Sequence, residues 1–541
     1  MTEPPVTEFP PPADQPEPEH ALPRRNAFTR FLDGVEWLGN LLPHPVTLFA
    51  LLALGIVLLS GLFGYLGVAV VDPRPAGAPG VADDGMIRAV SLLNGDGLRR
   101  IFTGLVDNFT GFAPLGVVLV AMLGVGVAEK SGLLSAAVRS LVLGAPPKLV
   151  TVAIVFAGII SNTASEVGYV VLIPLGGAIY YALGRHPLAG MAAAFAGVSG
   201  GYSANLLIGT IDPLLAGITE EAAQLIDPDY TVLATANWYF MFASTFLITA
   251  IGSLVSIYIV EPQLGKFDDS KADPDILDEG MMQPLQDTEK KGLRWAGIAM
   301  LGVFALMALT LWPEWGVFRN PESGDRMDSP FFDGFVVWIL IFFVTIGYAY
   351  GRAAKTMRTD RDVIDAMAGA LSSLGLYIVL VFFAAQFVAF FGWTNLGGIT
   401  AVTGAQFLKD TGMTGPAMFF AFIGICALIN LSLGSASAQW AVTAPIFVPM
   451  LMLIGYSPEA IQAAYRIGDS TTNIITPMMS YFGLILAWAT RYQKDLGVGT
   501  LIAMMLPYSM VFIVTWSIFF YLWTFVLGLP VGPGSPTYYT P

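Results

Sequence analysis

Two long apolar segments of this chain are each interrupted by small polar residues, and the interruptions recur about 270 residues apart. The first interruption reads Ser-Asn-Thr-Ala-Ser-Glu at 161–166, and the second reads Gly-Ser-Ala-Ser-Ala-Gln at 434–439. When one segment is laid on the other, five positions coincide: Pro174/Pro445, Gly184/Gly455, Pro187/Pro458, Gly197/Gly468 and Ser199/Ser470. Paired, interrupted hydrophobic segments in corresponding halves point to the binding site of a secondary transporter. The pattern therefore predicts two related halves whose interruptions meet at one site.

The composition places the chain in a membrane. Of its 541 residues, 55% are hydrophobic and only 12% are charged, and the mean hydropathy is +0.67. A soluble protein carries roughly twice that share of charge. About ten apolar runs are long enough to cross or enter a bilayer, for which a spanning helix needs ~20 residues. A large soluble core is a poor explanation for so many long runs.

Enzymatic chemistry is not indicated. The single cysteine, Cys426, allows no disulfide within the chain and no paired-cysteine metal site. The three histidines, His20, His44 and His186, are too scattered for a zinc or haem site. The chain has no HExxH or GxSxG motif in a suitable context, so a membrane protease or lipase is disfavoured. We expect no catalytic residues, no cofactor apart from Na⁺ as a bound ion, and no nucleic-acid partner.

The net charge of −14 comes largely from water-exposed segments. A Pro-rich acidic N-terminal stretch cannot bury enough apolar surface to fold, and we expect it to be a disordered cytoplasmic tail. The resulting division is a tail at 1–27, a first repeat at 28–260 with a hairpin near 161–183, a linker at 261–292, a second repeat at 293–530 with a hairpin near 433–455, and a tail at 531–541.

Basic residues predict the topology in part. Arg24, Arg25 and Arg30 place the N-terminus inside, and the basic loops at 261–292 and 355–361 also read as inside. The first 260 residues hold five long runs, although an even number of crossings is required. Either 131–144 also crosses or one run is re-entrant. Non-helical backbone survives at membrane depth only when it is buried in protein or faces a cavity. The two interrupted segments are therefore most simply helix–turn–helix hairpins.

Hairpin tips and unwound helices expose free backbone groups. Their N–H groups attract anions, and their carbonyls hold cations such as Na⁺ together with Asn, Ser, Thr and Asp side chains. The first half offers Asn162, Thr163, Ser165, Glu166, Gly200, Gly201, Ser203, Asn205 and Asp212. The second half offers Asn430, Ser432, Ser435, Ser437, Trp440, Arg466, Asp469, Ser470, Thr471, Thr472 and Asn473. Small polar residues also pack helices together, so the clustering at two equivalent places carries the argument.

Ionisable and aromatic residues are stronger candidates, since a charge at membrane depth is costly unless it is paired or hydrated. Asp212 either serves the site or caps a helix. Arg466 and Asp469 are three residues apart, so they either form a local structural ion pair or have separate functional roles. In the second case Arg466 binds a substrate carboxylate and Asp469 carries a proton or a cation. Trp440 stacks on an aromatic ligand or simply packs.

Several blocks resemble the AbgT family of bacterial transporters of p-aminobenzoyl-glutamate, some of which export sulfonamides. The similarity lies in 31–45, in the hairpin at 161–166, in the break at 200–205 and in the block from Ser437 to Pro477, and it extends over about 28–525. It implies an all-α, multi-pass inner-membrane protein of two inverted repeats. It further implies a homodimer embedded in lipid, with about nine transmembrane helices, two re-entrant hairpins and broken helices at the midplane of each subunit.

The resemblance also implies roles for individual residues. It places the substrate path at Asp212, Ser437, Trp440, Pro458, Arg466, Asp469 and Pro477, and it links Asn430 and Asp212 to cation binding. Together with the hairpin argument, the expected substrate site comprises Asn162, Ser165, Asp212, Ser437, Trp440, Pro458, Arg466, Asp469 and Pro477. The expected cation site comprises Asn162, Thr163, Gly200, Asn205, Asp212, Asn430, Asp469, Thr472 and Asn473.

These residues predict a secondary transporter of a small molecule, coupled to Na⁺ or H⁺. A molecule with two carboxylates and an aromatic ring suits Arg466, the hairpin N–H groups and Trp440. Recognition by arginine alone equally suits a simple dicarboxylate, so a Na⁺-coupled dicarboxylate symporter of the related ion-transporter superfamily is the main alternative. An ion channel and a membrane-bound amidohydrolase are further alternatives.

Overall fold

The computed structural model describes residues 43–74, 81–164, 168–268 and 284–540. The predicted acidic tail at 1–27, the arginines Arg24, Arg25 and Arg30, and the candidate site residues Ser165 and Glu166 lie outside the described residues. The described chain is mostly helical, and its one sheet is a small antiparallel pair, β1 (Ala69–Val71) and β2 (Met86–Arg88).

The helices of the first half follow one another with short connections. They are α2 (Pro45–Tyr65), α3 (Gly95–Thr110), α4 (Ala113–Lys130), α5 (Leu133–Leu143), α6 (Val150–Ser161), α7 (Ile173–Ala182), α8 (Pro187–Phe195), α9 (Ile211–Ala223), α10 (Trp238–Val255) and α11 (Glu261–Leu264). Wider π-helical turns precede α7 at Gly168–Leu172, follow α8 at Ala196–Gly200 and join α10 to α11 at Ser256–Val260.

The second half has a matching order. Its helices are α13 (Asp287–Leu311), α14 (Pro330–Asp333), α15 (Phe335–Ala354), α16 (Asp360–Ser373), α17 (Gly375–Trp393), α18 (Leu396–Asp410), α19 (Met418–Leu433), α20 (Ala436–Met452), α21 (Pro458–Thr472), α22 (Phe482–Tyr492) and α23 (Val498–Tyr521). The α13 helix begins at Asp287, inside the expected linker, because Gln286 and Glu289 form a reciprocal capping box there.

The helices α6 and α7 form a re-entrant hairpin, and so do α19 and α20. In the first, Thr151 near the start of α6 lies 2.5 Å from the Tyr180 hydroxyl near the end of α7. In the second, Phe419 packs edge-on against Tyr456, just beyond α20, with ring centroids 5.0 Å apart. Each hairpin therefore leaves the membrane on the side from which it entered. The interruptions at 162–168 and 434–435 are the tips between the arms, so the expected hairpin ranges cover the tip and the outgoing arm only.

The two hairpins enter from opposite sides. The Arg185 side chain at the end of the first hairpin pairs with Glu261, the first residue of α11, at the end of the span that α10 begins. At the other end of α10, the Ala236 carbonyl accepts a hydrogen bond from Ser535, in a segment that also bridges to Tyr456. Since α10 is long enough to span the membrane, the repeats are inverted. The basic loops put the end of α10 inside the cell.

The first half has an even number of crossings, as its loops require. Among the described residues, seven helical spans are long and apolar enough to cross a membrane. We count the broken helices α8–α9 and α21–α22 as two further crossings, which gives nine, and four of these lie in the first half (α2, α3–α4, α8–α9 and α10). At 11 residues, α5 is about 16 Å long, too short for a ~30 Å core. Of the two alternatives for the first half, the re-entrant one is therefore confirmed.

The coincident glycines and prolines occupy equivalent places. Gly184 and Gly455 both adopt positive φ, +70° and +106°, at the turn that follows each hairpin, and Pro187 and Pro458 each begin the next helix. A Cβ on Gly197 would lie 2.4 Å from the Val155 carbonyl of α6, and one on Gly468 would lie 2.6 Å from the Ile423 carbonyl of α19. Each broken helix therefore packs backbone-to-backbone on the incoming arm of its own hairpin.

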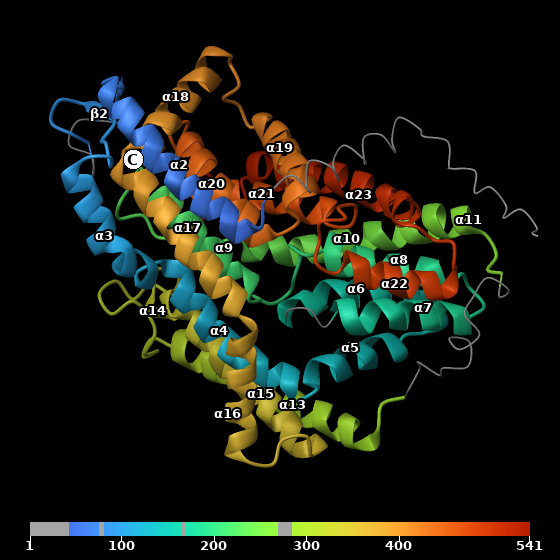
Figure 1. Cartoon of the computed structure of the whole chain (residues 1–541). Coiled ribbons are helices and arrows are strands. Elements are labelled where there is room, and N and C mark those ends of the chain that lie inside the picture. Colours follow the sequence, from blue (N-terminus) through green and yellow to red (C-terminus); the bar gives the residue numbers. More distant parts are fainter. Residues whose placement is uncertain (1–42, 75–80, 165–167, 269–283, 541) are drawn as a thin grey trace, which may run out of the picture.

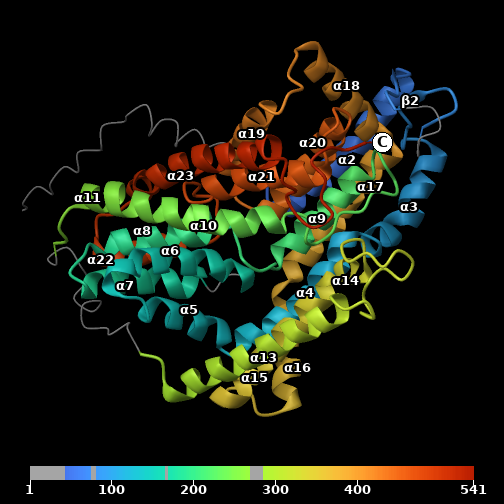
Figure 2. The same cartoon turned by 180° about the vertical axis from the view of Figure 1, so that it is seen from behind.

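The outer and inner surfaces are well separated. β2 and α18 lie at one end of the molecule, far from α11 and α16 (Figure 1 and Figure 2). At the outer end, residues 529–540 form a strap across the surface. Ser535 bonds to Ala236, Tyr539 to Asp227, and the Ser457 N–H to the Thr537 carbonyl. The strap joins the outer loop of the first repeat to the turn after the second hairpin.

Candidate functional site

The tip of the first hairpin is held by the broken helix of its own repeat. The α6 helix is built of small and β-branched apolar residues and ends at Ser161, and the backbone then tightens through Asn162 and Thr163. The Thr163 hydroxyl donates to Asn205 Oδ1 at 2.8 Å, in the break between α8 and α9. Both side chains are buried. The structure thus brings together three of the expected cation-site residues.

The second repeat has an equivalent polar cluster around Asn430 on α19. Its amide nitrogen donates to the Asp469 carbonyl at 2.8 Å, to Thr472 Oγ1 at 3.0 Å and to Asn473 Oδ1 at 2.8 Å. All four residues were expected in the cation site. All of these hydrogen bonds use the amide nitrogen, and the side-chain oxygen of Asn430 accepts none of them.

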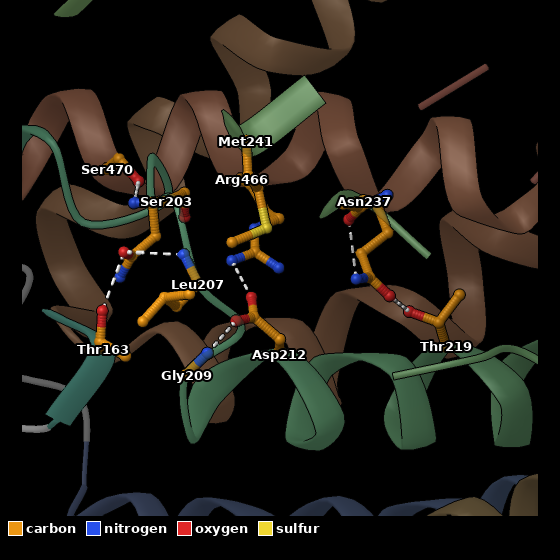
Figure 3. Close-up of polar contacts among 12 residues, drawn as sticks. Thr163, Ser203, Leu207, Gly209, Asp212, Thr219, Asn237, Met241, Arg466 and Ser470 are labelled. Carbon is orange, nitrogen blue, oxygen red and sulfur yellow. Dashed lines mark hydrogen bonds and ion pairs between the residues drawn. The ribbon is translucent and has the colours of Figure 1, made fainter. Parts of the chain in front are cut away.

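The two repeats meet through a buried ion pair. Arg466 Nη2 on α21 donates to Asp212 Oδ1 on α9 at 2.5 Å, and both side chains are only 3% exposed (Figure 3). The second Asp212 oxygen accepts the N–H of Gly209, two residues before α9, at 2.7 Å, and α9 has no side-chain cap at its N-cap residue Thr210. The expected alternative of a local pair between Arg466 and Asp469 is therefore wrong. Arg466 pairs instead with Asp212, 254 residues away in the chain, because α9 and α21 pack against each other.

Several buried polar atoms at these clusters have no partner among the described residues. They are Asn162 Oδ1, Asn430 Oδ1, Asp469 Oδ1, and Arg466 Nε and Nη1. Buried polar groups are nearly always hydrogen-bonded, so each exception needs an explanation. Oxygen atoms left over on Asn430 and Asp469 suit a hard cation, and spare guanidinium N–H groups suit a carboxylate.

A cavity of about 470 Å³ lies between the two hairpin tips. Asn162 lines it from the first tip, Ser435 and Ser437 from the second, and Asn473 from the second broken helix. Glu129, an exposed residue at the inner end of α4, lies at its edge. The cavity therefore opens toward the inner side. Its volume is within the range of roughly 300–1,000 Å³ that drug-sized ligands occupy.

Sequence reasoning missed the aromatic lining of this cavity. Tyr169 follows the first tip and Tyr481 follows the break after α21, and their rings stack with centroids 4.6 Å apart and planes 8° apart. Tyr202 and Tyr377 complete the lining. The signal is present in the sequence, since three of these tyrosines flank the interruptions, but nothing in the spacing shows that they converge.

Trp440 does not line the cavity. Its indole is fully buried, stacks on Tyr465 with centroids 4.2 Å apart, and donates its N–H to Thr219 at 2.8 Å. Thr219 continues to Gln462 and Asn237 in a buried chain of hydrogen bonds. In this arrangement Trp440 packs α20 against α21 and α9.

Three other candidates have structural surroundings of their own. Gly200 packs on the Phe512 ring, where an added Cβ would lie 2.9 Å away. Pro458 is the buried first residue of α21, and Pro477 is half-buried in the break that follows this helix. Gly200 belongs to the broken helix of the first repeat, whereas Pro458 and Pro477 bracket the helix that carries Arg466 and Asp469, and none of the three lines the cavity.

Two inverted halves that each contribute a hairpin and a broken helix to one cavity define a secondary membrane transporter. Comparison with known proteins agrees with this class and identifies the family. The chain belongs to the family described as "AbgT putative transporter family", which matches residues 30–539. It is a multi-pass protein of the bacterial inner membrane, and its relatives are transporters, not enzymes.

Three relatives illustrate the match. The p-aminobenzoyl-glutamate transport protein of Escherichia coli is 35% identical over 514 residues, which cover 95% of this chain and 98% of that protein. The structure of Neisseria gonorrhoeae MtrF, described as an antimetabolite efflux pump, has a TM-score of 0.88 at 60% identity, covering 94% of this chain and all of that one. The Alcanivorax borkumensis YdaH transporter, described as having an unusual topology, has a TM-score of 0.83 at 46% identity, covering 91% and 100%.

Proposed function

We propose that this protein is a secondary active transporter of p-aminobenzoyl-glutamate or related aromatic folate-pathway metabolites, including sulfonamide antimetabolites, and that transport is coupled to Na⁺ or H⁺. The observation that carries the proposal is the cavity between the hairpin tips, which combines a tyrosine lining with polar backbone tips. The names of the Escherichia coli and Neisseria relatives support the same substrate class.

The aromatic part of the substrate has a matching surface. Tyr169 and Tyr481 come from different repeats and present stacked rings at the cavity wall. Offset-stacked rings attract one another by about 0.5–1.5 kcal/mol beyond the area they bury. A p-aminobenzoyl or sulfonamide ring stacks on these tyrosines, and an aliphatic dicarboxylate gains nothing from them. This lining favours an aromatic substrate over the dicarboxylate alternative.

The acidic part of the substrate is matched by the tips and by Arg466. Arg466 does not line the cavity, but its partner Asp212 directly follows the lining residues Thr210 and Ile211 at the start of α9. Two N–H groups of Arg466 have no partner among the described residues and are available to a carboxylate. Substrate binding that draws Arg466 toward a carboxylate weakens its pairing with Asp212, and this links the two repeats to occupancy.

The coupling ion has a candidate position at Asn430 and Asp469. Their unpartnered oxygens belong to the second repeat, and Asn473 next to them also lines the cavity. A Na⁺ bound to these oxygens, or a proton on Asp469, neutralises buried negative charge beside the substrate. The assembly we propose is a homodimer in the lipid bilayer, since two-fold dimers are the commonest closed oligomers.

Uptake into proteoliposomes tests the proposal. Labelled p-aminobenzoyl-glutamate, a labelled sulfonamide and labelled succinate are compared, with Na⁺ and H⁺ gradients imposed one at a time. We expect one of the aromatic compounds to accumulate against its gradient. Movement of succinate alone would overturn the substrate assignment, and flux that does not depend on a second gradient would overturn secondary transport.

A pair of variants separates ring recognition from general damage. Tyr481→Leu removes the ring at the cavity, and Tyr258→Leu removes a ring that is 72% exposed in the π-helical turn after α10 and does not line the cavity. From the value of a stacked pair, we expect Tyr481→Leu to lower the apparent affinity for the aromatic substrate about 2- to 10-fold. Tyr258→Leu leaves it unchanged. Equal losses in the two variants would refute the role of the stacked tyrosines.

A further inference from the structure

A second cavity, separate from the transport site, lies between the first hairpin and the helices α13 and α15. It has a volume of about 290 Å³, and its walls are almost entirely apolar. Leu133 of α5, Leu293, Gly297 and Met300 of α13, and Phe343 of α15 line it. The two hydroxyl groups that line it at the hairpin tip already donate hydrogen bonds, Ser161 to the Gly158 carbonyl and Thr163 to Asn205. The cavity therefore suits an apolar occupant.

A smaller hollow of about 50 Å³ adjoins the cavity along α13. It shares Leu207, Phe342 and Phe343 with the cavity and extends to Met307. From Leu293 to Met307, the helix rises about 21 Å. One leaflet of a bilayer contributes about half of the ~30 Å hydrocarbon thickness. The crevice is thus long enough to hold an acyl chain from one leaflet along its whole length.

The face of α13 beside the crevice meets the bilayer. Trp295, Ile298 and Leu301 are each more than 50% exposed on this helix. At the inner end, Arg139 of α5 pairs with Glu289 of α13 and ties the two helices together below the crevice. A chain that fills the crevice therefore enters sideways, from the hydrocarbon region above this ion pair.

Basic residues stand where the headgroup of such a lipid would lie. Lys290 and Arg294 are exposed and precede the lining residues Leu293 and Gly297 by about one helical turn on the same face of α13. They lie on the cytoplasmic side, where anionic lipids attract juxtamembrane basic residues. The apolar walls suit an acyl chain and the basic residues suit an anionic headgroup, and an anionic phospholipid has both.

We infer that the crevice between α5, the first hairpin and α13 is a binding site for one acyl chain of an anionic phospholipid from the inner leaflet. An empty apolar void forfeits the dispersion contacts of the atoms that line it, and an acyl chain restores them. The bound lipid lies against the hairpin tip, next to Thr163, and so separates the tip from α13 and α15. This site is independent of the substrate proposal.

Two glycines of α13 provide a matched test. A side chain on Gly297 would project into open space in the crevice, and a side chain on Gly302 would also meet nothing but lies outside the lining. Leucine is a better helix former than glycine, so both variants are expected to fold. The proteins are extracted from their membranes in mild detergent, supplemented with phosphatidylglycerol, and weighed intact by native mass spectrometry.

We expect wild type and Gly302→Leu to retain one phosphatidylglycerol per subunit through delipidation, and Gly297→Leu to retain at least fivefold less. A second variant tests the headgroup. Arg294→Gln is expected to lose the preference for phosphatidylglycerol over phosphatidylcholine, and Arg361→Gln on α16 is expected to keep it. Equal lipid retention in wild type and Gly297→Leu would overturn the inference. So would a loss of dimer, without loss of lipid, in Gly297→Leu, because a second copy of the chain would then cover the crevice.

Discussion

The buried pair between Asp212 and Arg466 gives the sharpest prediction. Asp212→Asn keeps the shape of the side chain and removes its charge. Arg466 then remains buried with no anionic partner among the described residues, since its Nε and Nη1 already lack one. Removing one member of a buried pair costs about 3–5 kcal/mol. The folded-to-unfolded ratio is therefore expected to fall about a hundredfold to a few thousandfold.

A double variant and a matched control decide what the pair does. Asp212→Asn combined with Arg466→Gln leaves no orphan charge, and we expect it to recover at least half of the lost stability. Glu261→Gln breaks the pair with Arg185, whose members are 24% and 23% exposed, and is expected to cost at most about 1 kcal/mol. Unfolding in dodecyl sulfate, followed by the fluorescence of the 11 tryptophans, measures five proteins: wild type, Asp212→Asn, Arg466→Gln, the double variant and the Glu261→Gln control.

Transport gives an independent readout of the same variants. If Arg466 binds a substrate carboxylate, the double variant regains stability and stays inactive in proteoliposomes. A double variant that is as unstable as the sum of its single changes would refute the pairing. Recovery of transport along with stability would show that the pair only holds α9 to α21.

Packing and charge elsewhere in the molecule lead to three more expected outcomes. Gly468→Ala pushes a Cβ against the Ile423 carbonyl and is expected to lower the free energy of unfolding by about 1–3 kcal/mol. Its control, Gly424→Ala on α19, meets open space and should leave the stability unchanged or raise it. Equal effects of the two variants would contradict the close packing. Trp440→Ala is expected to cost about 3–5 kcal/mol and to reduce uptake of aromatic and aliphatic substrates equally, and a selective loss of aromatic uptake would restore its predicted ligand role. The Arg88 side chain and the Met86 N–H lower the pKa of Asp84 in the outer loop. The stability that these contacts give to β1–β2 is therefore complete above the usual Asp pKa and is lost as the pH falls through the lowered pKa. Hydrogen exchange of residues 84–90, measured against pH and corrected for intrinsic rates, should show this loss in wild type and not in Arg88→Ala.

Much of the architecture can be predicted from the sequence, because it follows from local chemistry. The recurrence of Gly197 and Gly468, and of Pro187 and Pro458, is enough to locate the broken helices. The lengths of the apolar runs indicate crossings, and polar residues inside those runs indicate where backbone leaves the helix. These features depend on residues close together in the chain.

The partners of the charged and aromatic residues cannot be predicted in the same way. A separation of three residues is visible in a sequence and suggests Asp469 as a partner for Arg466, whereas the contact with Asp212 depends on how two inverted halves interlock. Tyr169 and Tyr481 stack for the same reason. Trp440 lies beside a polar tip in the sequence, yet its ring turns away from the cavity toward Tyr465. Orientation of a side chain around a helix at a break is a tertiary property.

The strap at residues 529–540 has a consequence for how the protein is made. The Ala236 carbonyl receives its hydrogen bond from Ser535, 299 residues later in the chain, and Tyr539 reaches back 312 residues to Asp227. During synthesis, the outer loop of the first repeat therefore waits, incompletely bonded, until the second repeat has been threaded through the membrane. Contacts between such distant residues form slowly. Biogenesis of the outer surface is thus a late event, and a chaperone or protease on that side of the membrane meets the first repeat before it is sealed.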